Sequence, residues 1–156
     1  AHNTLTINGE RHLVESNAPI TRTFESKKQK GAEVDLSTVF ANSVKKAVRT
    51  VILDQKDHLE VIDSLETRDK EATVSWIMVT PAEAKITGKN RIELTKDGQR
   101  MLLTADTGTE VEMKIWSNVP PHEYDFRNPG TIRVGFETVI PANRASQLKV
   151  RLIPLK

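Results

Sequence analysis

The chain has 156 residues and a mass of 17.5 kDa, which is long enough for one domain with a sizeable core. Its 23 Lys and Arg nearly balance its 21 Asp and Glu, so the net charge of +2 gives no strong attraction to nucleic acid or to an anionic membrane. We therefore expect neither partner. The chain has no cysteine, which excludes disulfides and thiolate metal sites. No apolar run approaches the roughly 20 residues of a membrane-spanning helix.

The first half of the chain alternates short strand patterns with turns. Residues 4–7 predict a short strand, and Asn8-Gly9 predicts a tight turn after it. Residues 25–33, which contain several lysines and Gly31, are expected to form a loop. Asp35 could cap a helical turn over residues 35–41, but Thr and Val weaken a helix there, so we expect a turn or irregular segment. Residues 47–53 and 58–65 then form a strand, turn, strand pattern.

The second half carries the clearest strand periodicity. Residues 72–80 become apolar on both faces and end at Pro81, which predicts a central core strand. Asp97-Gly98 predicts a hairpin between residues 91–95 and 100–104. Apolar and polar residues alternate in 110–116, 131–137 and 147–152, whereas 118–130 is expected to be a loop. Strands with one solvated face are typical of antiparallel sheets. We therefore predict an all-β fold, a two-layer antiparallel β-sandwich formed by residues 1–156 as a single domain.

Few residues in the sequence point to catalysis. The four histidines form neither a His-x-His nor a His-x-x-x-His pair, and no Gly-x-Ser-x-Gly elbow or phosphate-binding glycine loop occurs. An ordinary solvated or hydrogen-bonded side chain is the better interpretation of His12, His58 and His122. His2 differs because it stands directly before the first strand pattern.

Aromatic and basic side chains could contact a sugar polymer. Trp76 lies in the most apolar strand, which favours core packing. Trp116 lies on the strand face opposite Met113, so a sugar or domain contact and simple packing are about equally supported. Tyr124 lies in a Pro-rich loop without a motif. The following basic residues could meet a polyanion, although a solvated face is the commoner explanation: Lys27, Lys28, Lys30, Lys45, Lys46, Arg49, Arg133, Lys149 and Arg151.

The opening His2-Asn3-Thr4-Leu5 and the Asn8-Gly9 that follows resemble a motif of the heparinase II/III-like polysaccharide lyases. In that family the motif begins the C-terminal β-sandwich region. The order of later segments agrees, including 34–37 with Phe40 nearby, the strand pair 49–53 and 59–65, and 74–76. Asn8 replaces the usual aspartate of the motif, and Phe40 replaces a usual tyrosine. The resemblance covers essentially the whole chain.

This resemblance implies a role for the chain as the C-terminal part of a larger lyase. It implies an upstream α-helical toroid domain, an acidic polysaccharide such as a glycosaminoglycan or alginate as substrate, β-elimination as the reaction, and a periplasmic or secreted bacterial location. By the same resemblance, His2 would be one ligand of a zinc ion whose other ligands lie upstream. One imidazole cannot hold zinc by itself, so we expect no stoichiometric zinc and no catalysis from these residues alone.

Two other functions remain open at the level of sequence. A non-catalytic carbohydrate-binding module would need exposed aromatics on a sheet face, for which Trp116 is the candidate. A structural accessory domain would pack on another domain and bind no glycan itself.

Overall fold

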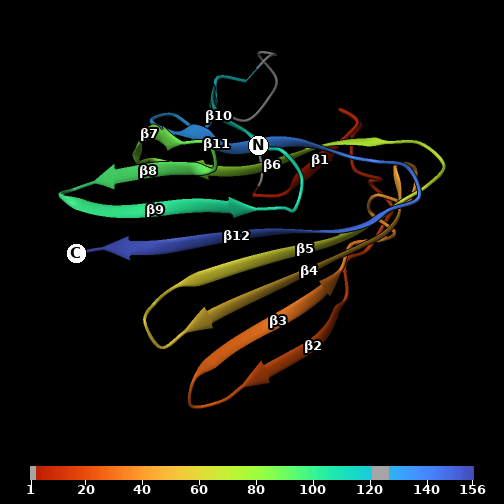
Figure 1. Cartoon of the computed structure of the whole chain (residues 1–156), viewed down its shortest axis with the longest axis horizontal. Helices are drawn as coiled ribbons and strands as arrows, with labels where there is room; N and C mark the ends of the chain where they lie inside the picture. Colours follow the sequence, from red (N-terminus) through yellow and green to blue (C-terminus); the bar gives the residue numbers. More distant parts are fainter. Residues whose placement is uncertain (1–2, 121–126) are drawn as a thin grey trace.

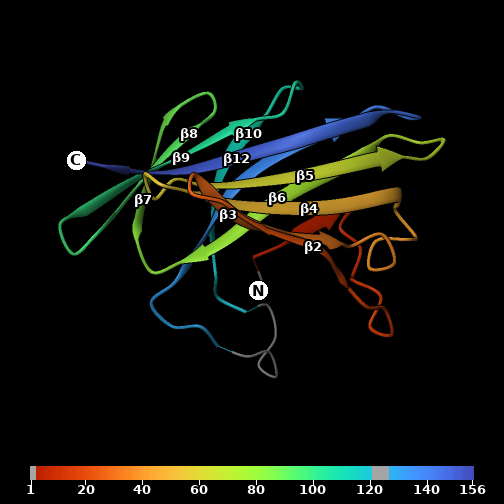
Figure 2. The ribbon, with the colours of Figure 1, turned by 90° about the horizontal axis from the view of Figure 1, so that it is seen from below.

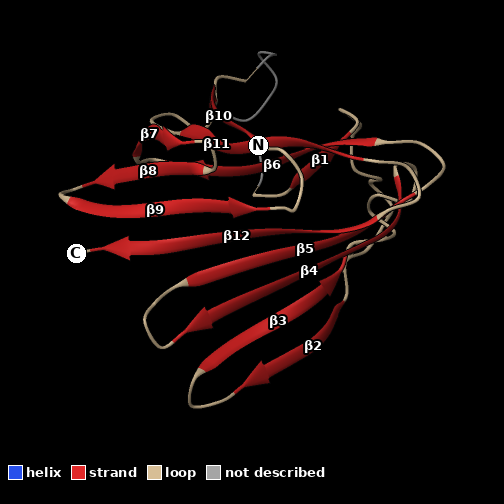
Figure 3. Ribbon diagram, in the orientation of Figure 1, coloured by secondary structure: helices blue, strands red, loops and turns tan. Residues whose placement is uncertain are grey.

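Two antiparallel β-sheets make up the computed structural model, which describes residues 3–120 and 127–156. Figures 1 and 3 show these sheets, with the smaller one at the top of the view and loops joining the strands. The small sheet has the order β1-β6-β11-β10. Its strands are β1 (Leu5–Ile7), β6 (Ala72–Thr80), β11 (Ile132–Ile140) and β10 (Glu112–Ser117).

The large sheet has the order β2-β3-β4-β5-β12-β9-β8-β7. Its strands are β2 (Ile20–Glu25), β3 (Gln29–Asp35), β4 (Val44–Asp54), β5 (Leu59–Thr67), β12 (Ala145–Leu155), β9 (Gln99–Asp106), β8 (Arg91–Lys96) and β7 (Glu83–Gly88). All pairings in both sheets are antiparallel, which confirms the predicted all-β sandwich. Among the described residues there is no helix that could cross a membrane.

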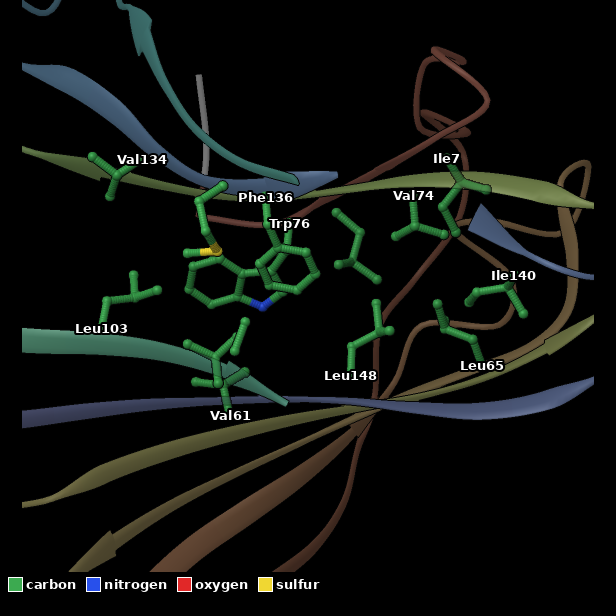
Figure 4. Close-up of a cluster of buried hydrophobic side chains, with 14 of the residues drawn as sticks. Ile7, Val61, Leu65, Val74, Trp76, Leu103, Val134, Phe136, Ile140 and Leu148 are labelled. Carbon is green, nitrogen blue, oxygen red and sulfur yellow. The ribbon is translucent and has the colours of Figure 1, made fainter. Parts of the chain in front are cut away.

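The core lies between the sheets and follows the period of two along each strand. In β5, Val61 and Leu65 are buried and alternate with half-buried neighbours. Trp76 of β6 and Phe136 of β11 come from the opposite sheet, and their rings stack with centroids 6.1 Å apart. Figure 4 shows these side chains meeting between the two layers. Trp76 is only 4% exposed, so the predicted core role of this residue is confirmed.

The two predicted Asx-Gly turns are present. Asp97 and Gly98 have φ angles of 51° and 75°, and they connect β8 to β9. Asn8 and Gly9 have φ angles of 55° and 68° and follow β1 directly. Positive φ at two successive positions matches the right-handed twist of a tight hairpin, and Asn, Asp and Gly tolerate it best.

The loop expected at residues 25–33 is wrong, because residues 29–33 lie in β3. The sequence predicted a loop here because glycine usually marks a loop, and Gly31 lies within this segment. Here it allows close approach on both sides: a Cβ at Gly31 would lie 2.4 Å from the Val51 carbonyl oxygen of β4 and 2.5 Å from Cζ of Phe24 on the paired strand β2. By contrast, residues 37–43 form turns, which confirms the turn expected within residues 35–41, although Asp35 itself ends β3.

The small sheet covers only part of the large one. β2 and β3 lie at the far end of the large sheet, away from the small sheet, whereas β7 at the other end contacts β10 (Figures 1 and 2). Every residue of β2 is exposed except Phe24, which is half-buried. The two sheets therefore contact each other on the side of β7 and β10, whereas the small sheet does not cover β2 and β3.

Candidate functional site

The segment after His2 is fixed to the small sheet by hydrogen bonds at both of its ends. At the start, Oδ1 of Asn3 accepts a hydrogen bond from the Val79 N–H at 2.8 Å. The Thr4 carbonyl accepts one from the Ile77 N–H at 3.1 Å. At the other end, Oδ1 of Asn8 accepts the Thr73 N–H at 3.0 Å. The motif asparagines therefore extend the short ladder between β1 and β6 on either side.

A buried ion pair beneath this segment ties it to the large sheet. Arg49 of β4 and Asp63 of β5 lie directly opposite each other, and Asp63 is 1% exposed. Nε and Nη2 of Arg49 donate to the two carboxylate oxygens of Asp63 at 2.7 and 2.9 Å. The indole Nε1 of Trp76 also donates to Asp63, at 3.1 Å. The remaining Nη1 of Arg49 donates to the Asn3 carbonyl at 3.0 Å.

Two opposing effects act on the Asp63 carboxyl. Burial raises its pKa above the ordinary value, because an ionised group loses hydration in the core. The hydrogen bonds from Arg49 and Trp76 favour the ionised form and limit that rise. An isolated charge here would be very unfavourable, so Asp63 and Arg49 depend on each other.

The two described histidines, His12 and His58, each contact a different group and do not form a metal site. Nε2 of His12 lies 3.0 Å from the Leu5 carbonyl, and its ring packs edge-on against Phe40. Nδ1 of His58 lies 3.3 Å from the Asp54 carboxylate in the turn between β4 and β5. Both are the hydrogen-bonded side chains that the sequence predicted. His2 and His122 lie outside the described residues.

Residues 3–120 and 127–156 contain no group of three His, Asp or Glu side chains that could hold a metal ion. These residues alone therefore do not fit a zinc site. The zinc ligand role of His2 stays a prediction that depends on residues beyond those described.

Trp116 lies at the open edge of the small sheet. It is half-buried and pairs with Arg133 of β11, which in turn pairs with Val79 of β6. Nε and Nη2 of Arg133 donate to the Ser117 carbonyl at 3.0 and 2.8 Å. The three side chains form a row across the sheet, and Val79 also binds the Asn3 side chain through its N–H. Trp116 thus shares one end of the small sheet with the motif that follows His2, while Tyr124 lies outside the described residues.

Several basic side chains proposed as polyanion contacts pair with carboxylates instead. Nε of Arg151 lies 2.7 Å from Glu60, and Lys45 lies 2.5 Å from Glu66. Both are exposed pairs on the sheet surface, which agrees with a solvated face.

The pairing of Arg49 with Asp63 was not predicted, although the sequence carries a signal for it. Asp63 interrupts an apolar alternation formed by Leu59, Val61 and Leu65, and Arg49 interrupts a matching one in β4. A charge at an inward position of each of two adjacent strands indicates a buried pair.

The fold places the chain among two-sheet antiparallel β-sandwiches. A family model described as "Heparinase II/III-like, C-terminal" matches residues 1–153. The chain belongs to this family, as the motif at its start indicated. No curated protein sequence matches the chain.

Solved structures show the same fold at low sequence identity. A crystal structure of heparinase III matches with a TM-score of 0.74 and 13% identity, over 99% of this chain and 23% of that one. A second heparinase III gives 0.71 and 16%, over 99% and 24%. The heparan sulfate lyase HepC from Pedobacter heparinus gives 0.66 and 17%, also over 99% and 24%. The chain thus spans about a quarter of the length of these proteins.

Proposed function

We propose that this chain is the C-terminal β-sandwich part of a lyase that cleaves an acidic polysaccharide by β-elimination. The observation that carries the proposal is the family match over residues 1–153. The similar structures include a heparinase III and a heparan sulfate lyase, which supports the substrate class. A sulfated glycosaminoglycan is therefore the first substrate to test, with alginate as the second.

In the proposed reaction a base removes the proton next to a uronate carboxylate, and an acid protonates the leaving glycosidic oxygen. We propose that both groups come from an upstream α-helical toroid, and that the sandwich forms one wall of the cleft. His2 would ligate a zinc ion together with upstream residues. Such an ion would supply positive charge near the site. This chain's own contribution is to hold the segment after His2 in place through Asn3 and Asn8.

The proposed location is the bacterial periplasm or outside the cell, because an acidic polysaccharide substrate would be found there. We propose no nucleic acid or membrane partner. Separation of periplasm from cytoplasm, followed by immunodetection of the full-length protein, checks this location.

The lyase proposal is tested in the full-length natural polypeptide that contains this chain. Incubation with heparan sulfate should produce the ultraviolet absorbance of unsaturated uronate, and the purified protein should contain about one zinc per chain. We expect His2→Ala to lose both. His58→Ala is the matched control, because the His58 side chain lies against Asp54 in the turn between β4 and β5, and it should keep both. Zinc and activity unaffected by His2→Ala would refute the ligand role, and absence of product from all tested uronate polymers would refute the lyase.

A carbohydrate-binding module is the second candidate, and the position of Trp116 favours it. A half-buried indole at the edge of an open sheet face can stack on a sugar ring. Calorimetric titration of this chain with heparin-derived and alginate oligosaccharides separates the candidates. If the wild-type chain binds an oligosaccharide and Trp116→Ala weakens that binding at least tenfold, about 1.4 kcal/mol, the result would support a module. Ile115→Ala is the matched control, since Ile115 is its exposed neighbour. Lack of binding by the wild-type chain fits the lyase part or a structural accessory domain, which the activity test then distinguishes.

A further inference from the structure

Arg49 makes three directed contacts from one side chain, and only two of them serve the ion pair. Nε and Nη2 bind Asp63, whereas Nη1 reaches the main-chain carbonyl of Asn3. The side chain of Arg49 is 15% exposed and that of Asp63 is 1% exposed. The arrangement therefore links β4 of the large sheet to the lead-in of β1 in the small sheet.

Stability alone is a poor explanation for this pair. Replacing a buried ion pair by well-packed apolar residues is often neutral or stabilising, because two charges must lose hydration. The neighbouring inward pairs of β4 and β5 are apolar: Ala47 faces Leu65, and Val51 faces Val61. What a guanidinium adds at this position is a planar set of donors that can bind a carboxylate and a carbonyl at once.

We infer that Arg49, oriented by Asp63, is a positioning residue that clamps the backbone at Asn3, the residue next to the proposed metal ligand. Trp76 completes the orientation, since its indole holds the second carboxylate oxygen of Asp63. The link of this clamp to metal binding rests on the function proposed above for His2.

Two backbone amides of β6 report directly on this clamp. The Val79 N–H binds Oδ1 of Asn3, and the Ile77 N–H binds the Thr4 carbonyl. Successive amides of a strand point to opposite neighbours, so the amides of Trp76 and Met78 face β11 instead. Release of the Asn3 segment should therefore increase hydrogen exchange at Ile77 and Val79 more than at Trp76 and Met78.

The decisive experiment is hydrogen exchange, followed by NMR, on this chain and its variants. Arg49→Met removes the donors but leaves Asp63 unpaired, so it risks unfolding. The double variant Arg49→Met/Asp63→Asn leaves no unpaired charge and keeps an acceptor for the Trp76 indole. Arg49→Lys keeps a charge beside Asp63 but lacks the planar fork. Arg151→Met is the matched control, because Arg151 pairs with Glu60 on the outer face of the same sheet.

We expect the double variant and Arg49→Lys to increase exchange at Ile77 and Val79 about tenfold relative to Trp76 and Met78, the equivalent of about 1.4 kcal/mol. Arg151→Met should leave that ratio unchanged. An unchanged ratio in the double variant, or equal acceleration at all four amides, would overturn the clamp and leave Arg49 as a stabilising residue only.

A second measurement connects the clamp to the proposed metal site. In the full-length polypeptide, competition with a chromogenic chelator should show that Arg49→Lys weakens zinc binding about tenfold, with its unfolding transition nearly unchanged. Zinc affinity equal to wild type would overturn the positioning role. If the wild-type protein binds no zinc, the metal proposal fails, and the hydrogen-exchange ratio still decides whether the clamp exists.

Discussion

Close approach between strands restricts which amino acid can occupy some positions of this sandwich, and Gly135 is a clear example. Gly135 of β11 faces Ile77 of β6, and a Cβ added to it would lie 1.8 Å from the Trp76 carbonyl oxygen. Backbone atoms cannot move aside as a flexible side chain would. Any other residue at position 135 must push apart the two strands that carry Trp76 and Phe136.

We predict that Gly135→Ala lowers the free energy of unfolding by about 3 kcal/mol or more, because overpacking against backbone adds to conformational strain. Gly108→Ala is the comparison, since Gly108 has a φ of 64° but no atom within 4 Å of an added Cβ. It should cost only about 1 kcal/mol. Urea titration of both variants measures the difference, and equal costs would show that the strand contact at Gly135 relaxes freely.

Whole strands differ in how much of the core they contribute. β2 and β3 extend past the small sheet, and every residue of β2 except Phe24 is exposed. β5 and β12 lie under the small sheet and bury alternate side chains. Strands with few buried apolar contacts open locally at lower free energy than the core does.

The β2–β3 hairpin should therefore exchange its amide hydrogens by local opening. We predict that the amides that pair β2 with β3 exchange at least tenfold faster than those that pair β5 with β12, a difference of about 1.4 kcal/mol or more in opening free energy. Peptide-level mass spectrometry on the folded chain checks this order. Equal protection of the two pairs would mean that the large sheet opens only as one unit.

Strands with a strict apolar and polar alternation were predictable from the sequence. The hairpin of β8 and β9 and the pair β4 and β5 lie where the period of two and the Asx-Gly turn placed them. The edge strands β2 and β7 were missed, because both faces of an edge strand are partly solvated and the pattern fades. At the candidate site, His2 and Trp116 stood out by sequence. The contact of Arg49 with Asn3 did not, because it joins residues 46 positions apart and depends on the packing of two sheets.

The molecule as a whole carries carboxyl groups that respond to pH in opposite directions. The hydrogen bond from Lys114 lowers the pKa of Glu137 below its ordinary value of 4.5. Hydrogen bonds from Ser37 lower the pKa of Asp35 in the same way. Burial instead raises the pKa of Asp63. A carboxyl whose pKa is lower in the fold than in the unfolded chain stabilises the fold at neutral pH. A carboxyl whose pKa is raised by folding favours the fold when it is protonated, at lower pH.

For Glu137 the sign follows from proton uptake. Between its ordinary pKa of 4.5 and its lower pKa in the fold, the unfolded chain binds more protons than the native one, so stability falls as the pH falls. We predict that Glu137→Gln makes the decrease in unfolding free energy below pH 4.5 shallower, because the glutamine cannot titrate. Glu71→Gln, an exposed substitution between β5 and β6, serves as the control. Urea titrations at a series of pH values measure both slopes; an unchanged slope in Glu137→Gln would show that other carboxyl groups govern the acid sensitivity of the sandwich.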